Sequence, residues 1–172
     1  MTPNPLPPIT KPINKTLWFF QVALTIGFAM CLKIAPWKDD IALFNPDWIL
    51  LTLMYWSVVI PDRVGIFYAW AVGLLTDQLT GELFGLHALS YCLIVYACLK
   101  LHKRLRQYPL SQQLCFVFFC LLVAQLMFFF LKNLQHPVQL SVGFWFPIMA
   151  GTVCWFPLFT LLRTIHLPEQ AK

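Results

Sequence analysis

Six long apolar stretches, separated by short polar segments, constrain this chain more than any other feature of its sequence. They cover residues 16–35, 46–60, 64–80, 86–101, 111–131 and 143–162. A membrane-spanning helix needs about 20 mainly apolar residues, and soluble domains contain about 25% charged residues, whereas only 11% of this chain is charged. We therefore expect an all-α integral membrane protein, a single domain built as a bundle of six transmembrane helices.

The two ends of the chain lie outside these stretches. Residues 1–15 contain five prolines, which preclude a helix there, and residues 164–172 form a polar tail. With the N-terminus inside the cell, nine of the twelve Lys and Arg residues fall on the inner side. Because cytoplasmic segments are enriched in Lys and Arg, we expect both termini in the cytoplasm. If residues 41–60 do not span as one helix, five spans remain and the termini lie on opposite sides.

The densest basic cluster follows the fourth apolar stretch, in what we expect to be a cytoplasmic loop. It contains Lys100, Lys103, Arg104 and Arg106. Such a cluster anchors a membrane protein and attracts anionic lipid headgroups, and an acidic cytoplasmic partner is the alternative. Nucleic acid is not expected as a partner, because the basic residues lie at the ends of apolar stretches.

The second apolar stretch has a recognisable start and end. Asn-Pro-Asp-Trp at 45–48 predicts a helix start, since proline fits the first helical turn and Asp47 favours the positive helix terminus. Tyr55, Trp56 and Pro61 close the stretch near a polar boundary, where aromatic side chains are common interfacial anchors.

The third apolar stretch carries a row of small residues at helical spacing. Gly65, Ala69, Gly73, Asp77 and Gly81 follow one another at intervals of four, so they share one face of a helix. Small residues at this spacing let helix backbones approach closely in lipid. We interpret the row as a packing seam, within the chain or with a partner helix, and a ligand site is the alternative.

Asp77 is the best single candidate for a functional side chain, because an acid within a span is costly and usually faces a cavity or a partner. Its position moderates this interpretation. If the helix ends near Thr80, Asp77 lies ~4.5 Å from the end, close to the outer interface, where it can be solvated or cap the Thr80–Gly81 turn. No second buried carboxylate or histidine is evidently placed to continue a proton relay.

Motifs of catalysis and metal binding are not found. The six cysteines form no CxxC pair, the four histidines are scattered, and GxSxG, HExxH and P-loop patterns are missing. We expect no catalytic residues, no metal and no cofactor. An intramembrane enzyme is the least supported alternative.

Several short motifs, taken in order, resemble the MreD family, which comprises rod-shape-determining inner-membrane proteins of bacteria. They are Asn-Pro-Asp-Trp at 45–48, Tyr-Trp at 55–56, Pro-Asp-Arg-Val-Gly at 61–65, Gly-Leu-Leu-Thr-Asp at 73–77, and Gly81 to Gly85 followed by His-Ala-Leu at 87–89. The positions that carry the resemblance are Pro46, Trp48, Tyr55, Trp56, Pro61, Arg63 and Gly85.

The resemblance implies a non-enzymatic scaffold of the cell-elongation machinery that makes peptidoglycan. Implied partners are the transmembrane helix of MreC, the cytoskeletal protein MreB, RodA and a class B penicillin-binding transpeptidase, together with membrane lipids. The implied fold is a six-helix bundle similar to the substrate-binding components of energy-coupling-factor transporters. That similarity supplies an alternative function, a solute-binding or transport component in which Asp77 and Trp70 line a pocket open to the outer face.

Overall fold

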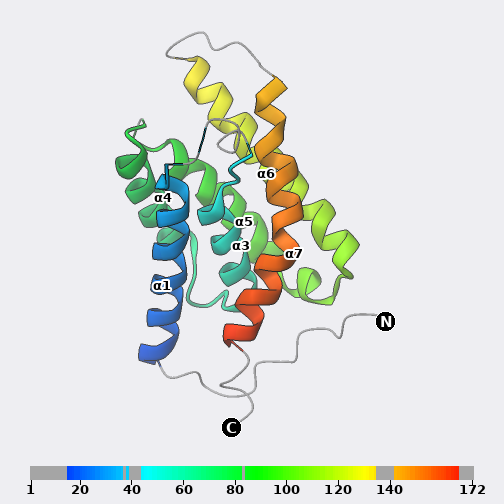
Figure 1. Ribbon diagram of the computed structural model, residues 1–172. Coiled ribbons are helices and arrows are strands. Elements are labelled where there is room, and N and C mark those ends of the chain that lie inside the picture. The colour runs from blue at the N-terminus through cyan, green and yellow to red at the C-terminus, as the bar shows by residue number, and fades with distance from the viewer. Residues whose placement is uncertain (1–14, 37, 39–43, 83, 135–141, 167–172) are drawn as a thin grey trace.

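Six α-helices and one short 3-10 helix make up the residues that the computed structural model describes, 15–36, 38, 44–82, 84–134 and 142–166 (Figure 1). They are α1 (Lys15–Ile34), α3 (Trp48–Val59), α4 (Ile66–Thr80), α5 (Leu86–Gln107), α6 (Leu110–Asn133), η1 (Val142–Trp145) and α7 (Phe146–His166). No strand occurs in these residues, and the predicted all-helical fold class is confirmed. The proline-rich start and most of the polar tail lie outside the described residues.

The helices coincide with the six apolar stretches, with one informative difference. α5 continues to Gln107 instead of ending near residue 101, so the basic cluster at 100–106 lies on its last turns. The prediction that this cluster forms a loop is wrong. Lys, Arg and Leu lose little side-chain freedom in a helix, and the helix ends only at Tyr108, whose extended backbone is the conformation favoured before Pro109.

α3 is the centre of the bundle. Every residue from Ile49 to Val59 is buried, and the helix packs against α1, α5 and α7. At 1.5 Å per residue its 12 residues extend only about 18 Å, well short of the ~30 Å hydrocarbon core of a bilayer. Its burial shows instead that the other helices enclose most of α3.

The central position of α3 corrects the interpretation of Tyr55 and Trp56 as interfacial anchors. Both side chains are buried, and Trp56 is 0% exposed. Its indole Nε1 donates a hydrogen bond to Thr25 Oγ1 on α1 at 2.9 Å, while the Tyr55 ring packs edge-on against Phe159 of α7. The pair joins three helices inside the bundle.

α6 and α7 supply the clearest membrane signal. Ser111–Asn133 and Gly143–Thr164 are long and apolar enough to cross a membrane, yet only 22% and 28% of their most apolar windows are buried. Their outward faces expose large apolar side chains such as Phe119, Phe130 and Val153. A core helix of a soluble protein would be mostly buried, whereas exposed apolar surface of this extent is typical of contact with lipid.

Candidate functional site

α4 and α5 form the closest helix pair of the bundle, and Gly73 is the reason. A Cβ built on Gly73 would lie 2.3 Å from the Cα of Ala88, so no larger residue fits without moving the backbone of α5. Ala69 and Asp77, one turn away on either side, are also buried. The middle of the small-residue row is therefore occupied by this chain's own α5.

The two ends of the row have other surroundings. A Cβ on Gly65 or Gly81 would meet no heavy atom within 4 Å. Gly65 is the N-cap of α4, and Gly81 ends α4 in the left-handed conformation with φ +66°, which glycine adopts without a steric penalty. Gly85, at φ +100°, plays the matching part at the start of α5. Gly81 and Gly85 together allow a tight turn, so that α5 begins beside the end of α4.

Asp77 is buried by this turn. Its side chain is 0% exposed and accepts hydrogen bonds from the backbone N–H groups of Gly85 at 2.8 Å and His87 at 2.9 Å. These amides belong to the first turn of α5, where unpaired N–H groups and the helix dipole favour an anion. The prediction of a solvated rim residue or a cap of the Thr80–Gly81 turn is wrong, because the carboxylate caps the following helix.

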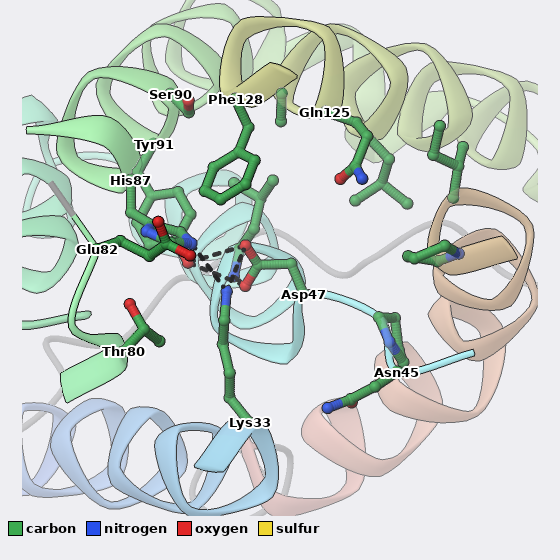
Figure 2. Close-up of a pocket in the computed structure, with 16 residues that line it drawn as sticks. Lys33, Asn45, Asp47, Thr80, Glu82, His87, Ser90, Tyr91, Gln125 and Phe128 are labelled. Atoms are coloured by element: carbon green, nitrogen blue, oxygen red, sulfur yellow. Dashed lines mark hydrogen bonds and ion pairs between the residues drawn. The ribbon is translucent and has the colours of Figure 1, made fainter. Parts of the chain in front are cut away.

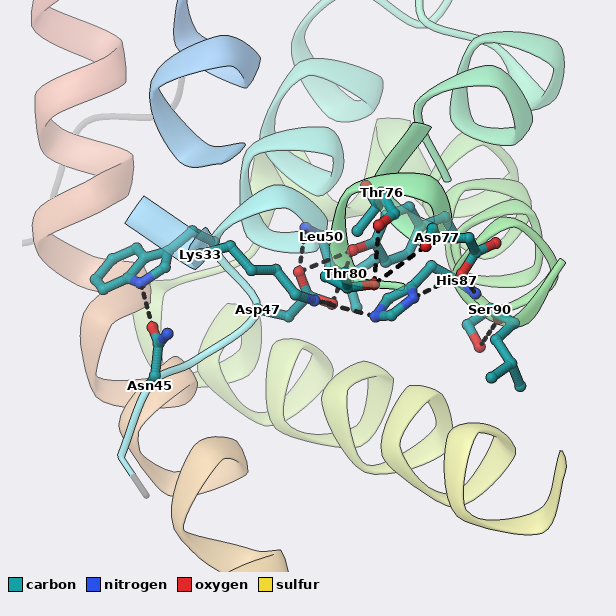
Figure 3. Close-up of polar contacts among 12 residues, drawn as sticks. Lys33, Asn45, Asp47, Leu50, Thr76, Asp77, Thr80, His87 and Ser90 are labelled. Carbon is teal, nitrogen blue, oxygen red and sulfur yellow. Dashed lines mark hydrogen bonds and ion pairs between the residues drawn. The ribbon is translucent and has the colours of Figure 1, made fainter. Parts of the chain in front are cut away.

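His87 extends the buried carboxylate into a chain of polar contacts (Figure 3). Its Nδ1 lies 2.7 Å from Asp77 Oδ1, and its Nε2 lies 3.1 Å from the Lys33 ammonium. Since an ammonium can only donate, Nε2 accepts and Nδ1–H donates to the carboxylate, which assigns the neutral tautomer. The expectation that no histidine stands beside Asp77 is therefore wrong.

Asp47 completes the chain from the start of α3. It is the N-cap of this helix, which begins at Trp48, two residues later than the start predicted at residue 46, and it accepts a hydrogen bond from Leu50 N at 3.2 Å. The hydroxyl of Tyr91 on α5 lies 2.9 Å from both carboxylate oxygens, and Lys33 Nζ lies 3.2 Å from Oδ2. Four helices are thus joined by one network that contains Asp47, Lys33, His87 and Asp77.

A cavity of about 320 Å³ opens beside this network (Figure 2). Its polar wall comes mainly from α1, α4, α5 and the start of α3, and its apolar wall from α6 and α7. Lys33 reaches in from one side, and Phe128 and Gln125 of α6 face it from the other. Glu82 stands at the rim and pairs with Lys132 at 2.7 Å.

The cavity differs from the pocket anticipated in the alternative function. Asp77 lies behind His87 and does not line the cavity, and Trp70 is 46% exposed and also lies outside it. The lining residues come from segments 33, 45–50, 80–91, 121–128 and 147–148. No sequence motif joins these segments, and only the helix packing brings them together.

The side chains of the polar network are arranged to bind a ligand and not to activate a nucleophile. Both ring nitrogens of His87 are already engaged, by Asp77 and Lys33, so the ring has no free nitrogen with which to activate a nucleophile. The nearby hydroxyl of Ser90 donates to Leu86 O instead. Within the described ranges, no three His, Cys, Asp or Glu side chains are grouped as metal ligands would be.

The opposite end of the bundle holds the basic cluster. Arg106 donates from Nε to Val58 O at 2.9 Å and from Nη2 to Val59 O at 2.6 Å, which satisfies the last carbonyl groups of α3. Lys100, Lys103 and Arg104 are exposed. Arg63 lies over the ring of Trp18, with 5.4 Å from its guanidinium carbon to the ring centroid. One member of the cluster is therefore structural, and three face outward.

Several of the family positions lie at the ends of helices. Pro46 is buried and contacts the position of Gly151, where an added Cβ would lie 3.3 Å from it. Trp48 Nε1 donates to Asn45 Oδ1 at 2.8 Å. Pro61 begins the turn between α3 and α4, and Gly85 begins α5. Pro46, Trp48 and Gly85 therefore lie at helix ends around the polar network, whereas Pro61 lies at the opposite end of the bundle, next to the α3 carbonyl groups that accept from Arg106.

Comparison with known proteins gives a consistent answer. The family model described as rod shape-determining protein MreD matches residues 14–165. The chain is 28% identical over 150 residues to the rod shape-determining protein MreD of Haemophilus influenzae, covering 87% of this chain and 93% of that protein. No solved structure matches.

Proposed function

This chain belongs to the MreD family of rod shape-determining proteins, and we propose that it is a non-enzymatic inner-membrane scaffold that docks the transmembrane helix of MreC. Family membership implies a role in rod shape determination and association with a membrane. The proposed contribution of the scaffold is to hold MreC beside MreB, RodA and the class B penicillin-binding transpeptidase, and so to link the cytoskeleton to peptidoglycan synthesis.

The proposed topology has six spans with both termini in the cytoplasm. The excess of Lys and Arg on that side supports it, as does the outward position of Lys100, Lys103 and Arg104 at the end of α5. These three side chains are placed to contact anionic lipid headgroups. The cavity beside Lys33 then opens toward the outer face.

An apolar groove between α1 and α7, floored by α3, carries the docking proposal. Its volume is about 900 Å³, and α1 and α7 flank α3 in Figure 1. An apolar groove bounded by helices is the feature that accepts a further helix in helix-in-groove recognition. The residues that line it are Leu24, Thr25, Gly27, Phe28, Ala29, Cys31, Leu32, Trp48, Thr52, Cys154, Pro157, Leu158, Leu161 and Leu162.

The two hydroxyl groups that line the groove, those of Thr25 and Thr52, are already hydrogen-bonded. Thr25 Oγ1 donates to Gln21 O at 2.9 Å and accepts from Trp56, and Thr52 Oγ1 donates to Trp48 O at 2.8 Å. The surface therefore offers van der Waals packing, which is the main attraction between helices in lipid.

Gly27 marks the point of closest possible approach. A Cβ at this position would meet no heavy atom within 4 Å, so the backbone of α1 is accessible from the groove. A small residue that is open to its surroundings lets a second backbone come near. Gly27 thus has the property that was first attributed to the Gly65–Gly81 row.

The experiment is Gly27→Leu with co-purification of MreC from cells. The added side chain enters the groove without meeting this chain, so we expect at least severalfold less MreC, rounded cells and normal amounts of folded protein. The matched control is Ala71→Leu, which adds a similar bulk at an exposed position of α4 outside the groove. Normal MreC recovery with Gly27→Leu, or equal loss with both variants, would contradict docking at this groove.

A further inference from the structure

The geometry points to a second, separate site: the cavity beside Lys33 binds a neutral, hydroxyl-bearing ring such as a sugar. This site does not depend on the groove between α1 and α7, and it could be occupied whether or not MreC docks there. The cavity's volume of about 320 Å³ lies at the lower end of the range for small-molecule pockets, about 300–1,000 Å³. A small ligand therefore fits, and a second helix does not.

The charges around the cavity disfavour an ionic ligand. Lys33 is paired with Asp47 at 3.2 Å, and Glu82 is paired with Lys132 at 2.7 Å. An anion would have to lie near the carboxylates of Asp47 and Glu82, and a cation would have to lie near the Lys33 ammonium. A neutral ligand disturbs neither pair, so the internal pairing selects against net charge.

The cavity nevertheless offers hydrogen-bonding groups that make no hydrogen bond to the described residues. The Gln125 side chain has no hydrogen-bond partner among the described residues, although it faces the cavity. Asn45 uses its amide oxygen for Trp48 and Glu82 uses Oε1 for Lys132, which leaves the Asn45 amide nitrogen and Glu82 Oε2 for a ligand. Hydroxyl groups both donate and accept, and they match this mixed set.

The two walls of the cavity match the two sides of a sugar ring. Polar groups gather around Lys33, Asp47 and Glu82, whereas α6 and α7 contribute the apolar lining residues Leu121, Phe128 and Ile148, of which Phe128 faces Lys33 across the cavity in Figure 2. A sugar ring presents hydroxyl groups at its edge and C–H groups on its face, so its face rests on the apolar residues while its edge hydroxyl groups reach Gln125 and the polar groups around Lys33. Water alone would leave the apolar wall without a favourable contact.

The test uses the full chain, purified in a zwitterionic detergent, because dodecyl maltoside carries a sugar headgroup and would compete. N-acetylglucosamine and maltose are titrated while the unfolding temperature is recorded. A ligand that binds only the folded state raises this temperature in a saturable way, whereas general stabilisation by sugars excluded from the surface does not saturate.

The variant is Gln125→Leu. The Gln125 side chain makes no hydrogen bond to the described residues, so we expect its replacement to leave the fold intact. Loss of one neutral hydrogen bond to the ligand weakens binding about fivefold. The matched control is Gln112→Leu on the same helix, an exposed position outside the cavity, which should bind like the unmodified protein.

Two further arms distinguish the source and the chemistry of the ligand. A saturable response to dodecyl maltoside but not to maltose would support the site and identify a sugar-headed lipid as its source. Saturable stabilisation by inorganic phosphate or choline in place of the saccharides would overturn the proposal. So would the lack of any saturable response, or equal binding by Gln125→Leu and the unmodified protein.

Discussion

Two glycines, Gly73 on α4 and Gly27 on α1, illustrate the difference between a closed seam and an open groove. Both are small residues on apolar helices, and both allow a second helix to come near. At Gly73 that helix is α5 of the same chain, whose backbone would lie 2.3 Å from an added Cβ; at Gly27 nothing lies within 4 Å. A small residue shows where helices can approach, and only the three-dimensional surroundings show whether the place is already filled.

The largest expected effect comes from adding one methyl group at each glycine. Gly73→Ala forces the backbone of α5 to move and should destabilise the protein by about 3 kcal/mol or more, the upper end of the cost of overpacking. Gly27→Ala adds a good helix former in open space and should stabilise the protein by about 0.5–1 kcal/mol.

Thermal unfolding in detergent measures both changes. The same substitution should thus give effects of opposite sign, and equal effects would mean that the contrast between seam and groove does not exist. A Gly73→Leu variant would not test partner binding, since the loss of the α4–α5 contact would by itself reduce the amount of folded protein.

The next largest effect concerns the carboxylate that closes the α4–α5 pair. Asp77→Asn keeps the shape but removes the charge that holds the first turn of α5 and the His87 ring, and should cost about 2–3 kcal/mol. Asp62→Asn, at an exposed position, is the control and should change stability by less than about 0.5 kcal/mol. Chemical denaturation of both variants would show a similar small change if the carboxylate had no structural role.

A smaller effect is expected at Lys33, which connects one wall of the groove to the polar network beside the α4–α5 contact. Lys33 extends from α1, one wall of the groove, to Asp47 and His87 in the polar network. Lys33→Met removes these contacts of a partly exposed ammonium and should cost about 1 kcal/mol. Lys38→Met, at an exposed position beyond the helix, should leave the unfolding temperature unchanged, and equal shifts for both lysines would show that the network does not hold α1.

The sequence predicted the helices well because long apolar stretches are a local property. It predicted a helix start near Asp47 for the same reason, since a helix start depends on neighbouring residues, although Asp47 proved to be the N-cap and not a residue of the first turn. It did not predict the burial of Tyr55 and Trp56, because aromatic residues near a polar boundary occur both at interfaces and in cores. The decisive fact, that α3 is short and central, depends on the packing of the other helices.

The surroundings of Asp77 could be predicted in part from the sequence. The short segment between the third and fourth apolar stretches contains Gly81 and Gly85, and glycine is the residue that a tight turn needs; such a turn brings the start of α5, with His87, back to the end of α4. The cavity could not be predicted from the sequence, since Lys33, Asp47 and Gln125 come from distant segments with no shared motif. Long-range placement of this kind follows from the packing of whole helices.

Disulfide crosslinking gives the most direct test of docking in the groove. Cys31 and Cys115 are both exposed, but only Cys31 lines the groove, whereas Cys115 lies on α6. Single cysteines placed in turn along the transmembrane helix of MreC would be oxidised in intact cells, and the linked residues identified by mass spectrometry. Docking in the groove predicts disulfides to Cys31, at MreC positions one helical turn apart, and none to Cys115. Crosslinks to Cys115, or none to Cys31 at any MreC position, would contradict it.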